Sequence, residues 1–463
     1  MPSINIKPKL LVVLCSDLYI RNYISSDAFR SIEENYKTSY LVSDKVQNMK
    51  VIEQKTFLIY SMNDKRVKLH FKIFDILMWR HRFKSKTFQF RIQRTIGFNA
   101  FFPESTSLLT RFLKIIWRFF RTFFYKIKNY LLVDSPLFHL YFCFNKFILG
   151  SNQDLENTIN KISPDLVIFP SQAYDPEGID LIEICNQSKI PTLFLIDNWD
   201  NLSSKTIFWR YPTKLGVWGD QSIDHAKRIQ GIDPKNVSAI GTPRYDHYFK
   251  LRSANLESVY KFPYMLFVGT ALEFDEFTVL EKINQVIENN KSIFGETKLV
   301  YRPHPWRQST GGKIPDNLQH VVIDSQVASN FLANNRSISI QPSLDYYPAL
   351  LSNAEFILGG LTSMMIEALI FNKIFLGFIH DDKKHFTSMH NVYNSYEHFQ
   401  GINDMDAIIL CNSLEKLENQ IKDAWKDRNL LDIHSTDAQR QYYYFHDEMT
   451  YSDRLKNLVD SVL

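Results

Sequence analysis

The sequence predicts an α/β protein made of two doubly wound, Rossmann-like domains. Its 463 residues exceed what one hydrophobic core usually supports, which favours two large domains. Short apolar segments of strand length recur along the chain, and many are followed by a helical pattern, which indicates parallel βαβ units. With 45% hydrophobic and 22% charged residues, the composition is typical of a globular protein.

The expected strands form two series along the chain. The first series covers residues 9–16, 38–43, 165–170, 191–196, 214–218 and 237–241, and the second covers 264–269, 298–302, 320–324, 355–359 and 373–377. The polar segment 250–263 between them is expected to be the linker. We therefore expect an N-terminal domain over 1–255, a C-terminal domain over 256–435, and a C-terminal helix over 436–463 that crosses back. In such a pair, ligands bind at the carboxyl ends of strands facing the cleft between domains.

A histidine motif follows the second strand of the second series. In Arg302-Pro-His304-Pro the imidazole is flanked by proline on both sides, which makes the loop rigid. His304 can donate a hydrogen bond to a phosphate oxygen, and Arg302 can add positive charge. A loop residue without a ligand is an equally good interpretation of this histidine taken singly.

A hydroxyl motif follows the fourth strand of the second series. The strand stops at Gly359-Gly360, and Thr362 and Ser363 precede a helical pattern. Hydroxyl groups and free backbone N–H groups at a helix N-terminus are typical of an anion site. Glu367, one turn further, can accept hydrogen bonds from ribose hydroxyls. The alternative is that the Thr or Ser is simply an N-cap.

The order of these motifs resembles GT-B glycosyltransferases of bacterial surface-polysaccharide biosynthesis. A Gly-Thr-Pro-Arg-Tyr-Asp motif at 241–246 precedes the histidine and hydroxyl motifs, and the resemblance covers about residues 165–380. CDP-glycerol glycerophosphotransferases and CMP-sugar transferases have the nearest patterns. The resemblance implies a GT-B fold and a nucleotide-activated donor bound by Arg244, His304, Thr362 and Ser363. The glycerophosphotransferases' His-Gly-Thr motif is lacking, which favours sugar transfer.

Two acidic clusters follow strands of the first series. Asp175 and Glu177 come after one strand, and Asp197 and Asp200 come after the next. An inverting transferase needs a carboxylate that takes the proton from the attacking hydroxyl, so these four acids are the candidate bases. Asp197 directly follows its strand and is preferred, although Asp also favours plain turns. Trp199, within the second cluster, is expected to stack on a sugar ring.

The sequence predicts no metal site and no cofactor. Asp404 and Asp406 form an Asp-x-Asp pair, but they precede a strand and so face the opposite end of the sheet. The four cysteines are far apart and form no CxxC pair, which favours a reducing cytoplasm. We find neither a signal peptide nor an uncharged apolar run of membrane-spanning length.

A basic insertion at 64–132 interrupts the first domain. Residues 64–128 carry 16 Lys and Arg against 3 acids. Within it, residues 109–132 have helical periodicity, most other positions are apolar, and four basic residues share one stripe: Arg111, Lys114, Arg118 and Arg121. This pattern is typical of a helix in an anionic membrane interface. The alternative is a helix packed on the first domain with its arginines outward; nucleic acid is disfavoured because no recognition fold accompanies the charge.

These patterns predict an inverting, metal-independent enzyme at the inner, cytoplasmic face of the plasma membrane. It would move sugar from a nucleotide-sugar donor to a surface glycan, as in capsule or lipopolysaccharide, or to a lipid-linked acceptor. Three alternatives stay open: a CDP-glycerol-type glycerophosphotransferase, a sugar-nucleotide epimerase, and a non-catalytic glycolipid-binding assembly protein. Titration with nucleotides distinguishes the assembly protein from the enzymes, because an assembly protein would bind no nucleotide.

Overall fold

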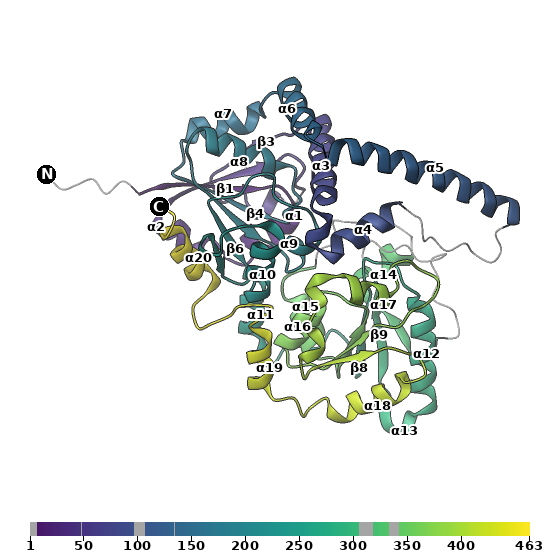
Figure 1. Cartoon of the computed structure of the whole chain (residues 1–463). Coiled ribbons are helices and arrows are strands. Elements are labelled where there is room, and N and C mark those ends of the chain that lie inside the picture. Colours follow the sequence, from purple (N-terminus) through teal and green to yellow (C-terminus); the bar gives the residue numbers. More distant parts are fainter. Residues whose placement is uncertain (1–6, 48, 97–106, 134, 305–317, 333–341) are drawn as a thin grey trace. The chain divides into compact units, whose positions relative to one another are not determined.

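In the computed structural model the chain forms two compact units, each built on one parallel sheet (Figure 1). The structure describes residues 7–47, 49–96, 107–133, 135–304, 318–332 and 342–463. The first unit comprises Met1–Asp246 and Tyr442–Leu463, and the second comprises His247–Gln441. The predicted fold class, two α/β domains of Rossmann type, is confirmed.

The sheet of the first unit has seven strands in the order β3-β2-β1-β4-β5-β6-β7. The strands are β1 (Lys9–Leu14), β2 (Lys37–Ser43), β3 (Phe57–Tyr60), β4 (Leu166–Ser171), β5 (Thr192–Ile196), β6 (Lys214–Val217) and β7 (Val237–Ala239). All neighbours pair in parallel, with Val12 of β1 opposite Tyr40 on one side and Ile168 on the other. The strand order reverses between β1 and β4, as in doubly wound sheets.

The apolar runs form strands because both faces of the sheet are covered. In β4 and β5 every residue is buried, which explains their continuous rather than alternating apolar pattern. The sequence analysis missed β3, a strand of four residues at the sheet edge in which Leu58 and Ile59 are exposed. An edge strand this short carries too little apolar pattern to be recognised.

The first unit also contains helical segments, part of which cover the two faces of its sheet and part of which pack on other helices. They are α1 (Asp17–Tyr19), η1 (Ile20–Ile24), α2 (Arg30–Asn35), η2 (Met49–Val51), α3 (Asp64–Arg80), η3 (Arg82–Lys84), α4 (Lys86–Ile96), α5 (Leu108–Val133), α6 (Leu137–Leu149), α7 (Gln153–Ile162), α8 (Glu177–Gln187), α9 (Asn201–Ser204), α10 (Asp220–His225), η4 (Ala226–Gln230), η5 (Pro234–Asn236), α11 (Pro243–Arg252) and α20 (Tyr451–Asp460). The boundary between the units falls within α11, so the expected linker at 250–263 begins inside a helix.

The C-terminal segment belongs to the first unit and is fastened there by Asp246. Oδ1 of Asp246 accepts hydrogen bonds from Arg454 Nη2 at 2.6 Å and from Tyr444 OH at 3.2 Å. Ser452 and Asp453 of α20 also bind Ser31 of α2. The acid of the Gly-Thr-Pro-Arg-Tyr-Asp motif therefore holds α20 in place.

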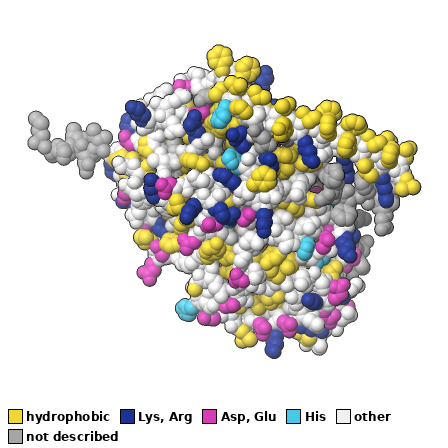
Figure 2. All heavy atoms as spheres, in the orientation of Figure 1, with side chains coloured by type: hydrophobic (Ala, Val, Ile, Leu, Met, Phe, Trp, Pro, Cys, Tyr) yellow, Lys and Arg dark blue, Asp and Glu magenta, His cyan; other side chains and the backbone are white. Residues whose placement is uncertain are grey.

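The helix expected at 109–132 is present as α5, and most of its apolar side chains are exposed. Its C-terminal part is attached to α3, through a bond from Trp79 Nε1 to Tyr125 OH at 3.1 Å and one from Arg80 to the carbonyl of Val133 at 2.8 Å. The exposed apolar residues of α5 include Leu109, Phe112, Leu113, Ile115, Trp117, Phe119, Phe120, Phe123 and Phe124. Figure 2 shows a band of hydrophobic side chains along this helix. Within the described residues, no helix is long and apolar enough to span a membrane.

The second unit repeats the doubly wound arrangement with six strands, in the order β10-β9-β8-β11-β12-β13. The strands are β8 (Tyr264–Val268), β9 (Lys298–Arg302), β10 (Val321–Ile323), β11 (Ile357–Gly359), β12 (Phe375–Phe378) and β13 (Ile408–Cys411). The helices are α12 (Glu276–Asn289), α13 (Lys291–Phe294), α14 (Ser325–Leu332), α15 (Tyr346–Ser352), α16 (Met364–Ile370), α17 (Met389–Ser395), η6 (Glu397–Phe399), η7 (Ile402–Asp404), α18 (Leu417–Asp427) and α19 (Ile433–Arg440). Here the order reverses between β8 and β11.

Candidate functional site

The acids of the first unit gather where its strand order reverses. Asp175 follows β4, Glu177 begins α8, and Asp197 directly follows β5. The charge of Asp175 acts on both Glu177 and Asp197, so the three carboxyl groups share one region. In doubly wound sheets, ligands bind at this point, outside the carboxyl ends of the strands.

Asp175 is held by a complete set of hydrogen-bond donors. Its carboxylate accepts from Tyr19 OH at 2.9 and 3.0 Å, from Ser171 Oγ at 2.9 Å and from the backbone N–H of Gln172 at 2.6 Å. Burial raises the pKa of Asp175, and the bonds from Gln172, Tyr19 and Ser171 act against that rise. These donors occupy the carboxylate oxygens of Asp175, which leaves less of the group open to a substrate hydroxyl.

Asp197 is buried and has the electrostatics of a general base. Only 3% of its surface is exposed, and Oδ1 accepts a hydrogen bond of 3.0 Å from Asn22 Nδ2. Burial raises the pKa of Asp197 to about 6, although Arg244 and the bond from Asn22 favour the charged form. A carboxyl group that titrates near neutral pH matches the task of taking a proton from a hydroxyl group.

Glu177 is the second acid suited to proton transfer. It is buried at the first position of α8. Burial, followed by repulsion from Asp175, raises the pKa of Glu177 to about 7. The pKa of Glu177 is higher than that of Asp197, so Glu177 is the more basic group. By position it is the weaker candidate, because Asp197 directly follows its strand and Glu177 does not.

The remaining residues of the second acidic cluster contact their own loop and the C-terminal segment. Asp200 Oδ2 accepts a hydrogen bond of 2.6 Å from Ser204 Oγ and lies 3.9 Å from Lys205 Nζ, at the start of α9. The prediction that Trp199 stacks on a sugar is wrong. Its side chain is 2% exposed and packs edge-on against Tyr443 of the C-terminal segment, with ring centroids 5.7 Å apart.

Arg244 lies in the first unit, close to Asp197. Its guanidinium lies over the rings of Trp218 and Tyr245, at 5.5 and 4.9 Å from their centroids. Its charge is the main influence that opposes the rise of the Asp197 pKa. Arg244 was expected to bind the donor; the structure places it in the first unit, where its charge acts on Asp197.

In the second unit, His304 follows β9 beside the end of β8. A Cβ added at Gly269 would lie 3.0 Å from the backbone nitrogen of His304, so glycine there allows the close approach. Glu276 joins the two strand ends, since it accepts from the backbone N–H of Thr270 at 3.1 Å and from Tyr301 OH at 2.5 Å. The rest of the motif, from Pro305 on, lies outside the described residues.

Thr362 and Ser363 follow β11, the neighbour of β8 at the reversal point. Ser363 is the N-cap of α16, but its side chain makes no capping hydrogen bond, and both hydroxyl residues are half-buried. A Cβ at Gly359 would lie 2.2 Å from the carbonyl oxygen of Val268, so the close approach of these strand ends requires glycine. Glu367 is buried in α16, which leaves little of it for a ribose.

The guanidinium of Arg302 is engaged in contacts inside the second unit. Its guanidinium pairs with Asp324 and donates to Gln326 Oε1 at 2.7 Å and to Tyr347 OH at 2.9 Å, with 3% of the residue exposed. The geometry therefore gives no support to Arg302 as a phosphate ligand. Its role is to hold the end of β9.

Three residues at strand ends were not among the sequence-based candidates. Asn22, which bonds Asp197, lies in a π-helical turn after β1, and such turns are frequent at functional sites. Thr270 follows β8, and His380 follows β12; burial lowers the pKa of His380. Their position after strands is the available signal, but none of the three stands in a recognisable motif.

The chain matches no protein family model and no curated protein. Solved structures match it over nearly its whole length at low identity. A protein assigned as a UDP-N-acetylglucosamine 2-epimerase from Listeria monocytogenes has 10% identity and a TM-score of 0.54, with 98% of this chain and 96% of that chain covered. The glycosyltransferase of kitacinnamycin has 7% identity and a TM-score of 0.50, with 99% of each chain covered. These likenesses show the fold, and both unit sheets match the two Rossmann-like domains of the GT-B class.

Proposed function

We propose that this protein is an inverting glycosyltransferase that uses a nucleotide-sugar donor. The observation that carries the proposal is the buried Asp197, with a pKa of about 6, at the reversal point of the first sheet. A second cluster of different chemistry, with His304, Thr362 and Ser363, lies at the corresponding point of the second sheet. One cluster suits an acceptor hydroxyl, and the other suits the phosphates of a leaving nucleotide.

In the proposed reaction Asp197 takes the proton from the acceptor hydroxyl. The oxygen then bonds to the anomeric carbon of the sugar, and the bond from that carbon to the nucleotide phosphate breaks with inversion. His304, Thr362 and Ser363 donate hydrogen bonds to the departing phosphate. The charge of Arg244 favours the ionised form of Asp197. We propose that a metal ion is not required, since the protein supplies both the base and the phosphate donors.

An epimerase is the second candidate, because one of the structures with this fold is assigned as such an enzyme. The products separate the possibilities. We would incubate the purified chain with UDP-, CMP- and GDP-activated sugars and analyse them by mass spectrometry and NMR. Release of free nucleotide supports transfer, whereas an isomerised nucleotide sugar with no nucleotide release contradicts it. CDP-glycerol tests glycerophosphate transfer, and a chain that binds no nucleotide at all is an assembly protein.

Replacement of His304 by alanine should weaken nucleotide binding by about 1.5–3 kcal/mol, the usual range for a hydrogen bond to a charged group. Isothermal calorimetry with the preferred nucleotide measures this. His320→Ala is the matched control, because His320 lies at the opposite, amino end of the sheet, before β10. Unchanged affinity in His304→Ala would remove the histidine from the donor site.

The rate should rise with pH through the pKa of the base. A general base acts only when it is deprotonated, so with Asp197 as the base kcat/KM should rise with a midpoint near pH 6 and level off at higher pH. If Glu177 is the base, the midpoint moves to about 7. Initial rates across this interval measure it, and a profile without any rise from the acid side contradicts both assignments.

We also propose that α5 attaches the enzyme to an anionic membrane, where the lipid-linked or surface-glycan acceptor is found. Support comes from its row of exposed apolar side chains and from the absence of acids among residues 107–133, which include six Lys and Arg. Lys114 and Arg121 are exposed, while Arg111 and Arg118 are half-buried. The inner face of the plasma membrane, which is anionic, is the corresponding location.

A further inference from the structure

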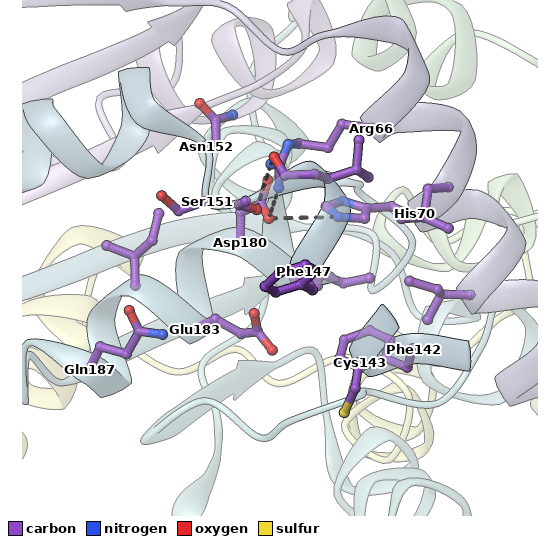
Figure 3. A pocket seen from close by; sticks show the side chains of 16 residues that line it. Arg66, His70, Phe142, Cys143, Phe147, Ser151, Asn152, Asp180, Glu183 and Gln187 are labelled. Carbon is purple, nitrogen blue, oxygen red and sulfur yellow. Dashed lines mark hydrogen bonds and ion pairs between the residues drawn. The ribbon is translucent and has the colours of Figure 1, made fainter. Parts of the chain in front are cut away.

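The first unit contains a cavity that the proposed transfer reaction does not use. It has a volume of about 440 Å³ and lies among α3, α6, α8 and the turn that follows α6 (Figure 3). Its size falls within the range of about 300–1,000 Å³ that is usual for small-molecule sites. Every lining residue belongs to the first unit.

The charged groups at one side of this cavity are balanced by one another. Arg66 Nη1 bonds Asp180 Oδ1 at 2.8 Å, and Arg66 Nη2 donates to the carbonyls of Leu149 and Gly150 at 2.9 and 2.8 Å. Both members of the pair are buried. Burial lowers the pKa of His70 to about 4, so the imidazole is neutral at pH 7. An arginine engaged in this way has no place for a phosphate or carboxylate ligand.

Most of the remaining lining is apolar and continues onto an exposed apolar surface, although Ser151, Asn152, Glu183 and Gln187 also line the cavity. Leu69, Ile73, Phe142 and Ile184 line the cavity. Phe147 lines it too, yet 86% of this residue is exposed, so it lies at the mouth. Further exposed apolar residues of the same helix surround it: Leu140, Phe144 and Ile148. A path of apolar side chains therefore leads from the surface of α6 into the cavity.

We propose that this cavity binds one hydrocarbon chain, acyl or isoprenoid, of a lipid from an anionic membrane. Arg66 and Asp180 are already paired with each other, so contact with the apolar wall of Leu69, Ile73, Phe142 and Ile184 is the main source of binding. The membrane is favoured over a soluble apolar ligand because α6 contacts α5, the helix with exposed apolar residues, six basic residues and no acid. The inference goes beyond sugar transfer, since binding of the chain requires neither nucleotide nor Asp197.

Cys143 provides a direct reporter of occupancy. It lines the cavity, and it is the exposed one of the four cysteines. Alkylation of the full-length protein by N-ethylmaleimide, followed by peptide mass spectrometry, gives its rate without interference from the others. Laurate is the probe. At a concentration about ten times its Kd, laurate should slow the alkylation of Cys143 roughly tenfold, whereas the much shorter butyrate should have little effect.

Two neighbouring surface substitutions locate the bound chain. Gln187 lines the cavity at the end of α8, and Asn186 beside it is exposed but does not line it. Gln187→Trp should abolish the protection by laurate, and Asn186→Trp should keep it. The proposal is overturned if laurate does not slow the reaction in the wild-type protein, or if the two variants behave alike. Nucleotide release from sugar donors is measured separately, so loss of one activity does not decide the other.

Discussion

Replacement of Asp197 by asparagine should lower turnover by roughly 10²–10⁴-fold, the usual scale for removal of a general base. Asparagine keeps an oxygen that can accept the bond from Asn22, so the side chain should stay in place. Donor affinity should not change, because His304, Thr362 and Ser363, the proposed ligands of the donor phosphates, lie in the second unit. Steady-state kinetics with saturating donor, combined with calorimetry for the nucleotide, measures both quantities.

The same substitution should make the protein more stable. The pKa of Asp197 is raised from 3.8 to about 6 by burial, so above the unfolded-state pKa the folded protein carries the cost of a buried charge. Removing that charge should raise the free energy of unfolding at pH 7 by up to about 3 kcal/mol, at 1.36 kcal/mol for each pKa unit. Loss of activity with a gain in stability is expected of a functional residue and not of a structural one.

Asp200→Asn is the matched control for Asp197→Asn. Asp200 lies three residues further along the same loop and bonds Ser204 within the start of α9. Its replacement should cost stability and leave most of the turnover. If Asp197→Asn is fully active instead, the base assignment fails, and Glu177→Gln and Asp175→Asn become the next variants to examine.

Replacement of Arg111, Lys114, Arg118 and Arg121 by glutamine should reduce binding to anionic liposomes by roughly a thousandfold. Each basic residue near such a surface contributes about 1 kcal/mol, so four of them give about 4 kcal/mol. Sedimentation with vesicles that contain phosphatidylglycerol measures the loss. The variant should still transfer sugar to a soluble acceptor, since the proposed base and donor ligands lie outside α5.

The control removes the same charge elsewhere on the first unit. Its four positions are exposed and lie off α5: Lys37, Lys50, Lys161 and Lys189. Binding to vesicles should be nearly unchanged in this control if α5 is the attachment site. Equal losses in both variants indicate a response to net charge alone. Unfolding or loss of nucleotide binding in the α5 variant shows instead that the helix belongs to the core of the first unit.

The strands were largely predictable, and the roles of the site residues were not. Continuous apolar runs such as β4 and β5 reveal buried parallel strands from local composition, and that in turn places Asp197 and His304 after strands. The short edge strand β3 has no such run. From the sequence alone, Asp175 and Asp197 are both candidates for the base, because both follow a strand.

Only the tertiary structure distinguishes them. The donors that occupy Asp175 include Tyr19, 156 residues away in sequence. Asp197 accepts a bond from Asn22 and is influenced by the charges of Arg244 and Arg21. The local sequence allows Trp199 to stack on a sugar ring, but in the structure Tyr443 of the C-terminal segment packs against it. The sequence by itself determined the two doubly wound sheets, because strand formation follows local apolar pattern. The pKa of an acid and the exposure of a ring depend on residues brought together from distant segments, and these the tertiary structure decided.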